Sequence, residues 1–173
     1  MVERIVLIGF RATGKTSTGK ALAKVLGWDF VDADEEIERA EGKTISEIVE
    51  SSGWEAFRKL EREYLKRVPE FKRCVIALGG GAVLHDKEME KIKDTSFVVW
   101  LKASPQEIAK RLSHDSKTST QRPSLTGKSV SDEVEKVLRE RLPLYQKFSH
   151  IEVDTTSAST EEVVSRILQL IKR

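Results

Sequence analysis

Short apolar runs alternate along the chain with longer amphipathic stretches. The apolar runs predict strands at residues 4–8, 28–31, 74–78, 97–101 and 151–153. Apolar positions repeat with helical spacing at residues 15–26, 45–68, 87–92, 105–112, 131–148 and 160–171. Strands that alternate with helices in this way predict an α/β fold in three layers, with helices on both faces of a central, mainly parallel five-stranded sheet.

Two segments depart from this alternation. Residues 34–68 hold two helical patterns between one strand and the next, which predicts a helical insertion. Residues 114–128 are polar and lack periodicity, and a loop of that length in a compact domain is usually a functional lid or disordered; we interpret it as a mobile lid. No repeat or Pro/Gly-rich linker divides the chain, so we expect one domain over residues 1–173.

A phosphate-binding loop joins the first predicted strand to the first predicted helix. Gly9, Gly14, Lys15 and Thr16 match the pattern G-x-x-x-x-G-K-[ST] in the strand–turn–helix context that the pattern requires. Backbone N–H groups of such a loop and the following helix N-terminus bind phosphate oxygens, while the lysine reaches the terminal phosphates. The sequence therefore predicts a site for ATP or GTP, with contacts from Gly9, Ala12, Thr13, Gly14, Lys15, Thr16 and Ser17.

Two carboxylates follow the second predicted strand. Asp32 and Asp34 lie where that strand ends, at the edge of the sheet where open α/β folds bind their ligands. Asp32 is placed to act on a magnesium shell or on the proton of an attacking hydroxyl, and Asp34 to accept hydrogen bonds from substrate hydroxyls. An equally good interpretation makes Asp32 and Glu35 a capping box for the next helix.

Arginines and glycines supply the candidates for a pocket that binds an acid. Arg58 and Arg141 fall in helical segments and can pair with a carboxylate through two hydrogen bonds, although Arg58 can equally pair with Glu61 or Glu55 on its own helix. The run Gly79–Gly81 directly follows a strand and allows a ligand to approach the backbone closely. Arg122 lies in the predicted lid, where it can stabilise charge on a transferred phosphate.

Composition narrows the function further. Lys and Arg exceed Asp and Glu by two, 30 against 28, and both signs are interleaved, so no basic stripe points to nucleic acid. No segment is long and apolar enough for a membrane span, and a lone Cys74 in an apolar run excludes a disulfide within the chain. We expect a cytoplasmic monomer that binds neither nucleic acid nor membrane. The three histidines share no metal-ligand spacing and are interpreted as caps or surface groups.

Taken in order, these motifs make the chain resemble the shikimate kinases over essentially its whole length. The resemblance rests on the phosphate-binding loop, Asp32 with Asp34, Phe57-Arg58 with Glu61, Gly79–Gly81, Arg122-Pro123 and Arg141 with Tyr145. It implies a kinase that moves the γ-phosphate of ATP to the 3-hydroxyl of shikimate, with Mg²⁺ as cofactor, in the pathway to chorismate.

The resemblance also implies roles for individual residues. Lys15, Asp32 and Arg122 would be catalytic, and Thr16 with Asp32 would hold the metal. Shikimate would bind to Asp34, Arg58, Gly80, Gly81 and Arg141. The adenine would lie between Arg111 and the loop at residues 154–159, which lacks the proline often found there. Arg122 would reach over the phosphates.

Other functions stay open at this point. A gluconate or nucleoside-monophosphate kinase would keep the phosphate-binding loop and a lid, but it would not require Phe57-Arg58, three glycines and Arg141 together. A nucleotide-binding regulator without transfer activity would not need Asp32, Asp34 and Arg122, all of which are present.

Overall fold

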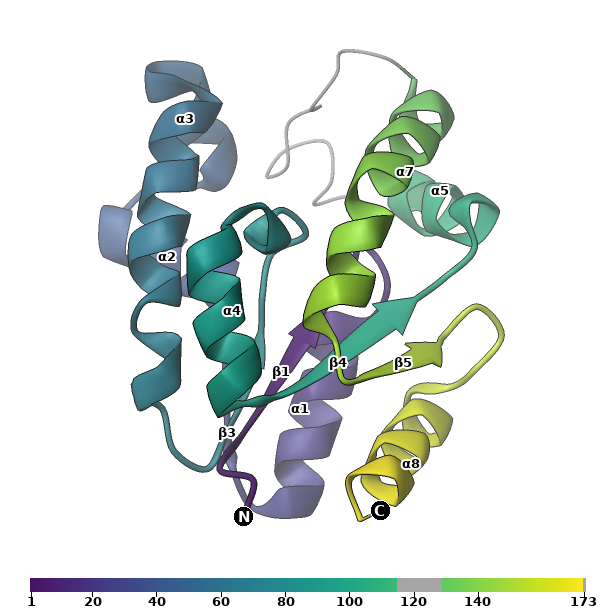
Figure 1. Cartoon of the computed structure of the whole chain (residues 1–173). Coiled ribbons are helices and arrows are strands. Elements are labelled where there is room, and N and C mark those ends of the chain that lie inside the picture. Colours follow the sequence, from purple (N-terminus) through teal and green to yellow (C-terminus); the bar gives the residue numbers. More distant parts are fainter. Residues whose placement is uncertain (115–128, 173) are drawn as a thin grey trace.

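The computed structural model describes residues 1–114 and 129–172, in which five strands form one sheet in the order β2-β3-β1-β4-β5 (Figure 1). The strands are β1 (Arg4–Ile8), β2 (Asp29–Asp32), β3 (Cys74–Ala77), β4 (Phe97–Lys102) and β5 (Ile151–Asp154). Val6 at the centre pairs with Ile76 on one side and with Val98 on the other. All pairings among the described strands are parallel, which confirms the predicted sheet.

Seven α-helices lie in the described residues. They are α1 (Lys15–Leu26), α2 (Ala33–Glu41), α3 (Ile45–Leu65), α4 (Asp86–Thr95), α5 (Pro105–His114), α7 (Val130–Phe148) and α8 (Thr160–Ile171). Side-chain oxygens of Thr44, Ser129 and Ser159 cap α3, α7 and α8 by accepting a backbone N–H three residues on. The two helical patterns of residues 34–68 are α2 and α3, and α3 is bent at Gly53 (φ 85°).

Alternate residues of β1 face the two sides of the sheet and belong to two separate cores. Ile5 and Leu7 pack with α1 and α8, whereas Val6 and Ile8 pack with residues of α2, α3, α4 and α7. Nearly every residue of β1, β3 and β4 is buried, as expected for strands covered on both faces. A third cluster around Phe10 joins the phosphate-binding loop to α5 and α7.

The two edges of the sheet differ in what they carry. At the amino edge Arg4 is buried and donates hydrogen bonds to the carbonyls of Phe71 and Thr95, which precede β3 and β4. At the carboxyl edge β1 leads into the phosphate-binding loop, β2 into α2 and β3 into the three glycines. Both chain termini lie at the end of the molecule away from these loops (Figure 1).

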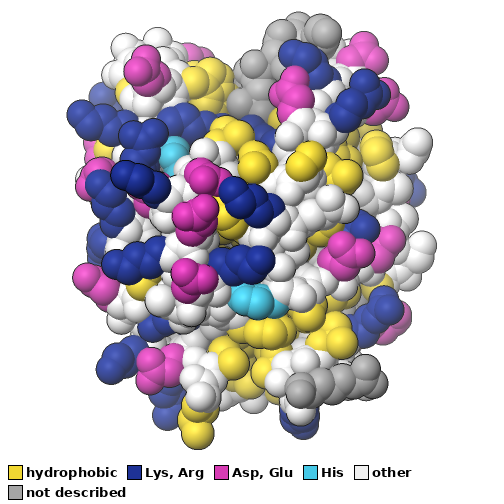
Figure 2. Space-filling view, viewed as in Figure 1, with side chains coloured by type: hydrophobic (Ala, Val, Ile, Leu, Met, Phe, Trp, Pro, Cys, Tyr) yellow, Lys and Arg dark blue, Asp and Glu magenta, His cyan; other side chains and the backbone are white. Residues whose placement is uncertain are grey.

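The surface carries both signs of charge. Lys and Arg side chains are interspersed with Asp and Glu over the face that shows α4 and α7 (Figure 2). Among the described residues, no helix is both long enough and apolar enough to cross a lipid bilayer.

Candidate functional site

The loop between β1 and α1 is shaped to hold phosphate. Gly9 has a φ of 148°, and a side chain there would collide with the Leu101 carbonyl. Ala12 and Gly14 also have positive φ (61° and 90°), so the backbone reverses repeatedly and aims N–H groups inward. Thr13 is buried and its hydroxyl donates to the Phe10 carbonyl at 2.8 Å, which fixes the curvature of the loop.

Lys15, Thr16 and Asp32 gather at one side of this loop. The Lys15 ammonium donates to the carbonyls of Gly9 and Phe10, at 2.6 and 2.8 Å. The Thr16 hydroxyl donates to Asp32 Oδ2 at 2.9 Å, while Asp32 Oδ1 accepts the Glu35 N–H at 3.2 Å and caps α2. The two interpretations of Asp32 are therefore compatible, because its two oxygens face different partners.

A groove beside the loop involves Arg111 of α5. It is lined by Ala12, Thr13, Gly14, Ser17, Thr18, Arg111, Thr155, Ala158, Thr160 and Val163. The Arg111 guanidinium donates to Glu107, to the Ala12 carbonyl and to the Thr155 carbonyl. Since these bonds lie in the guanidinium plane, its flat face stays available for stacking against an aromatic base.

A second pocket, the acid pocket, lies at the ends of β2 and β3, beside α2 and α3. Asp34, Arg58 and Arg141 line it together with Gly79, Gly80 and Gly81, so the structure brings together all the residues predicted to bind the acid. The three glycines have separate partners. A Cβ at Gly79 would lie 2.6 Å from Asp34 Oδ1, one at Gly80 would lie 3.3 Å from Arg141 Nη1, and one at Gly81 would collide with the Arg58 guanidinium.

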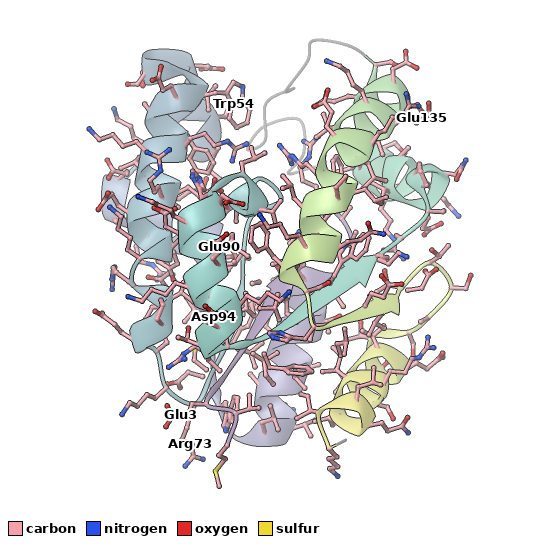
Figure 3. All side chains as sticks on the ribbon, in the orientation of Figure 1. Glu3, Trp54, Arg73, Glu90, Asp94 and Glu135 are labelled. Carbon is pink, nitrogen blue, oxygen red and sulfur yellow. The ribbon has the colours of Figure 1, made fainter. Side chains whose placement is uncertain are left out.

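Arg58 is held from several sides. Its Nη1 donates to Glu61 Oε1 at 2.8 Å, as one interpretation of the sequence expected, yet the side chain still lines the pocket. The rings of Trp54 and Phe57 lie 5.3 and 5.5 Å from its central carbon, within the range of cation–π contacts. Trp54 lies on the side of α3 turned toward the middle of the molecule (Figure 3).

The prediction for His85 was wrong. This residue was expected at the surface or as a cap, but its side chain is 3% exposed and its Nε2 lies 2.9 Å from Glu61 Oε1. His85 precedes α4 but makes no side-chain capping bond. This contact could not be predicted from local sequence, because Glu61 and His85 lie 24 residues apart.

Tyr145 of α7 supports the glycine run from below. Its hydroxyl donates to the Gly80 carbonyl at 2.7 Å, and its ring stacks on Trp100 of β4. Burial raises the pKa of Tyr145 to about 12, so the hydroxyl keeps its proton and remains a donor at neutral pH.

Sequence reasoning missed Arg11. It occupies an unspecified position of the phosphate-binding motif, yet it lines the acid pocket and forms an ion pair with the buried Glu133 of α7 at 3.2 Å. The pocket thus holds three arginines, Arg11, Arg58 and Arg141, beside two carboxylates, Asp34 and Glu61. This surplus of positive charge favours an anionic ligand.

Arg122 and nearly all of the predicted lid, residues 115–128, lie outside the described residues. Within the described residues, no cluster of three or more His, Cys, Asp or Glu side chains could hold a metal by itself. A metal held through Thr16 and Asp32 would therefore need further oxygen ligands from the nucleotide phosphates or from water.

Comparison with known proteins gives one consistent result. The family model for shikimate kinase matches residues 11–172. A shikimate kinase of Thermodesulfovibrio yellowstonii is 43% identical over 172 residues, covering 99% of this chain and 96% of its own. The structure of Acinetobacter baumannii shikimate kinase in complex with shikimate matches with a TM-score of 0.91 at 32% identity, covering 99% of this chain and 94% of that one. That of the Aquifex aeolicus shikimate kinase gives 0.83 at 34%, covering 98% and 96%.

Proposed function

We infer that this chain, which belongs to the shikimate kinase family, is a phosphotransferase that moves the γ-phosphate of ATP to the 3-hydroxyl of shikimate. The products are shikimate 3-phosphate and ADP, on the pathway to chorismate. The observation that carries this function is the acid pocket, where three arginines and Asp34 line one cavity at the same sheet edge as the phosphate-binding loop.

The acid pocket matches the chemistry of shikimate, which combines a carboxylate with ring hydroxyls. Arg58 and Arg141 would hold the carboxylate, each through a planar pair of N–H donors. Asp34 would accept hydrogen bonds from hydroxyls, and Gly80 and Gly81 leave room for the ring beside the backbone. We also assign Arg11 to this pocket, since it contributes charge from the phosphate-binding loop itself.

The loop side of the site fits Mg²⁺. The Thr16 hydroxyl and the Asp32 carboxylate are hard oxygen donors 2.9 Å apart, and Mg²⁺ is commonly held by one or two such protein oxygens together with substrate phosphates. When bound there, Mg²⁺ supplies positive charge that neutralises the phosphate oxygens.

The transfer itself needs positioning more than covalent chemistry. As the 3-hydroxyl oxygen bonds to the γ-phosphorus, the bond from that phosphorus to the bridging β–γ oxygen breaks, and ADP leaves. Lys15 and the loop N–H groups would hold the phosphates in line, and Arg122 would add charge. We assign to Asp32 the proton that the hydroxyl loses, which would reach it by way of a water, because Asp32 does not line the acid pocket.

Residues 34–68 would form the substrate-binding region and residues 114–128 a lid that excludes water, which would otherwise compete as acceptor. The cytoplasmic location and the monomeric state expected from the sequence stay predictions.

An ADP-release assay tests the function directly. The purified chain with ATP and Mg²⁺ is offered shikimate, quinate, gluconate and nucleoside monophosphates. We expect turnover with shikimate alone. Turnover only with gluconate or a nucleoside monophosphate would overturn the assignment of the acid pocket, and ATP binding without turnover on any acceptor would favour a regulator.

A further inference from the structure

Glu61 connects two side chains that come from different parts of the fold. Its Oε1 accepts from Arg58 Nη1 at 2.8 Å and lies 2.9 Å from His85 Nε2. Arg58 and Glu61 lie on α3, whereas His85 directly follows the short 3-10 turn Ala82–Leu84, which comes after the glycine run. The contact therefore ties the helix that carries Arg58 to the loop that shapes the acid pocket.

The chemistry fixes the direction of the hydrogen bond. Glu61 Oε1 already accepts from Arg58, which can only donate, so the hydrogen bond to the same oxygen places the proton on His85 Nε2. Both side chains are 3% exposed, so water cannot readily replace that donor. The second carboxylate oxygen, Oε2, is buried and has no hydrogen-bond partner among the described residues, so the interactions of Glu61 converge on the shared Oε1.

Loss of the His85 donor would change the orientation of the Arg58 guanidinium. A buried carboxylate with fewer donors is poorly solvated, and its carboxyl plane is then fixed by Arg58 alone. The Arg58 guanidinium lies directly against the backbone of Gly81, where little room exists for an altered orientation. A rotated Glu61 would consequently turn the N–H groups that Arg58 directs into the pocket.

We propose that His85 is a positioning residue for shikimate binding, acting through Glu61 to fix the orientation of the Arg58 guanidinium. The inference rests on the proposed function, because it takes Arg58 as a ligand of the substrate carboxylate. His85 does not line the acid pocket, so its effect is indirect.

Three variants at this position separate orientation from folding. His85→Leu removes the donor at similar size, His85→Gln keeps an N–H donor near the place of Nε2, and His85→Asn keeps a polar group that is too short to reach. We expect His85→Leu and His85→Asn to raise the shikimate KM about tenfold, the effect of losing one hydrogen bond to a charged group, with the ATP KM unchanged. His85→Gln should recover most of the affinity.

His150→Asn is the matched control, because it changes a histidine that lies far along the chain and outside the acid pocket. Its shikimate KM should equal that of the unmodified chain. If His85→Leu does not fold, the comparison of His85→Asn with His85→Gln decides the question. An unchanged shikimate KM in His85→Asn, or equal rises in both KM values, would overturn the proposal.

A double-variant comparison tests the route through Arg58. Shikimate affinity is measured by titration of tryptophan fluorescence, since Trp54 lines the pocket. In an Arg58→Ala background, His85→Leu should cause no further loss of affinity, whereas additive losses would show that His85 acts by another route. If Arg58→Ala itself left shikimate affinity unchanged, the assignment of Arg58 as a ligand of the substrate carboxylate would be wrong. That outcome is distinct from one in which only the His85 variants have no effect, which would overturn the role of His85 alone.

Discussion

At the scale of single residues, the acid pocket depends on missing side chains as much as on present ones. Gly81 has φ −92° and ψ 1°, a combination common at position i+2 of type I turns and open to alanine. Its lack of a Cβ is needed only because the Arg58 guanidinium lies against it. Glycine is therefore required at position 81 by its packing against the Arg58 guanidinium, and not by the backbone conformation of the turn.

Gly81→Ala should for this reason act on the acid and not on the nucleotide. We expect its added methyl group to displace Arg58 and to raise the shikimate KM about tenfold or more, with the ATP KM unchanged, because overpacking typically costs about 1–3 kcal/mol. Steady-state kinetics with each substrate varied in turn measures this. Gly80→Ala is the control with the milder expected effect, since its Cβ would lie 3.3 Å from a flexible arginine tip. Equal KM values for Gly81→Ala and the unmodified chain would contradict the argument.

Residue type and position predicted part of this pocket. Asp34 and the glycines could be placed because they directly follow strands, and all strands of a parallel sheet end at the same edge. Arg11 and His85 could not be placed. Arg11 occupies a position that the phosphate-binding pattern leaves unspecified, and the role of His85 depends on a residue 24 positions away on a different helix.

At the scale of elements, His150 joins β4 to the turn before β5. Its Nδ1 accepts the Val98 N–H at 2.9 Å, and its ring stacks on Phe97 at 5.5 Å. Burial first and the nearby Lys93 second lower the pKa of His150 below its ordinary 6.5, while Asp94 acts in the opposite direction. The folded chain therefore prefers the neutral ring, whose Nδ1 can accept.

This preference makes stability depend on pH. Above the unfolded-state pKa of 6.5 both states hold a neutral ring, so the stabilisation is fully present. As the pH falls below that value the unfolded state binds the extra proton first, and stability declines until the folded-state pKa is passed. Urea unfolding between about pH 5 and about pH 8 should show the decline, and His150→Asn, which keeps an acceptor that does not titrate, should reduce it. An identical pH profile for both proteins would contradict this account.

The elements themselves were largely predictable. The helices at Lys15–Leu26 and Thr160–Ile171 match the predicted bounds, because a single apolar stripe and a defined start mark each of them. The helix predicted at 45–68 ends at Leu65, and a 3-10 turn containing Pro69 follows it. The bend at Gly53 was not predicted, since a glycine within a helical pattern does not reveal which φ it adopts.

At the scale of the whole molecule, the two proposed ligand sites share one sheet edge but use different elements. The groove beside Arg111, which we propose for the nucleotide, is built by the phosphate-binding loop, α5 and the loop after β5. The acid pocket is built by α2, α3, the glycine run and α7, and Arg11 is its contribution from the phosphate-binding loop. Variants in one site should therefore spare the other.

Arg58→Ala and Arg111→Ala test this separation. We expect Arg58→Ala to raise the shikimate KM by about 10- to 100-fold with little change for ATP, because it removes charge-assisted hydrogen bonds to a carboxylate. Arg111→Ala should raise the ATP KM about tenfold and spare shikimate, since it removes a stacking surface. Thermal unfolding of both variants checks that the fold is intact. A rise in both KM values in either variant would show that the two sites are coupled.

The central place of β1 sets the order in which the chain can be assembled during synthesis. β1 is made before both of its partners, because β3 and β4 begin only at Cys74 and Phe97. Until those residues have left the ribosome, both edges of the apolar strand β1 are unpaired and can pair with strands of other chains. Such long sequence separations also slow folding, since loop closure precedes the contacts that reward it. The topology that places the phosphate-binding loop at the middle of the sheet thus leaves the edges of β1 open to intermolecular pairing until β3 and β4 have been synthesised.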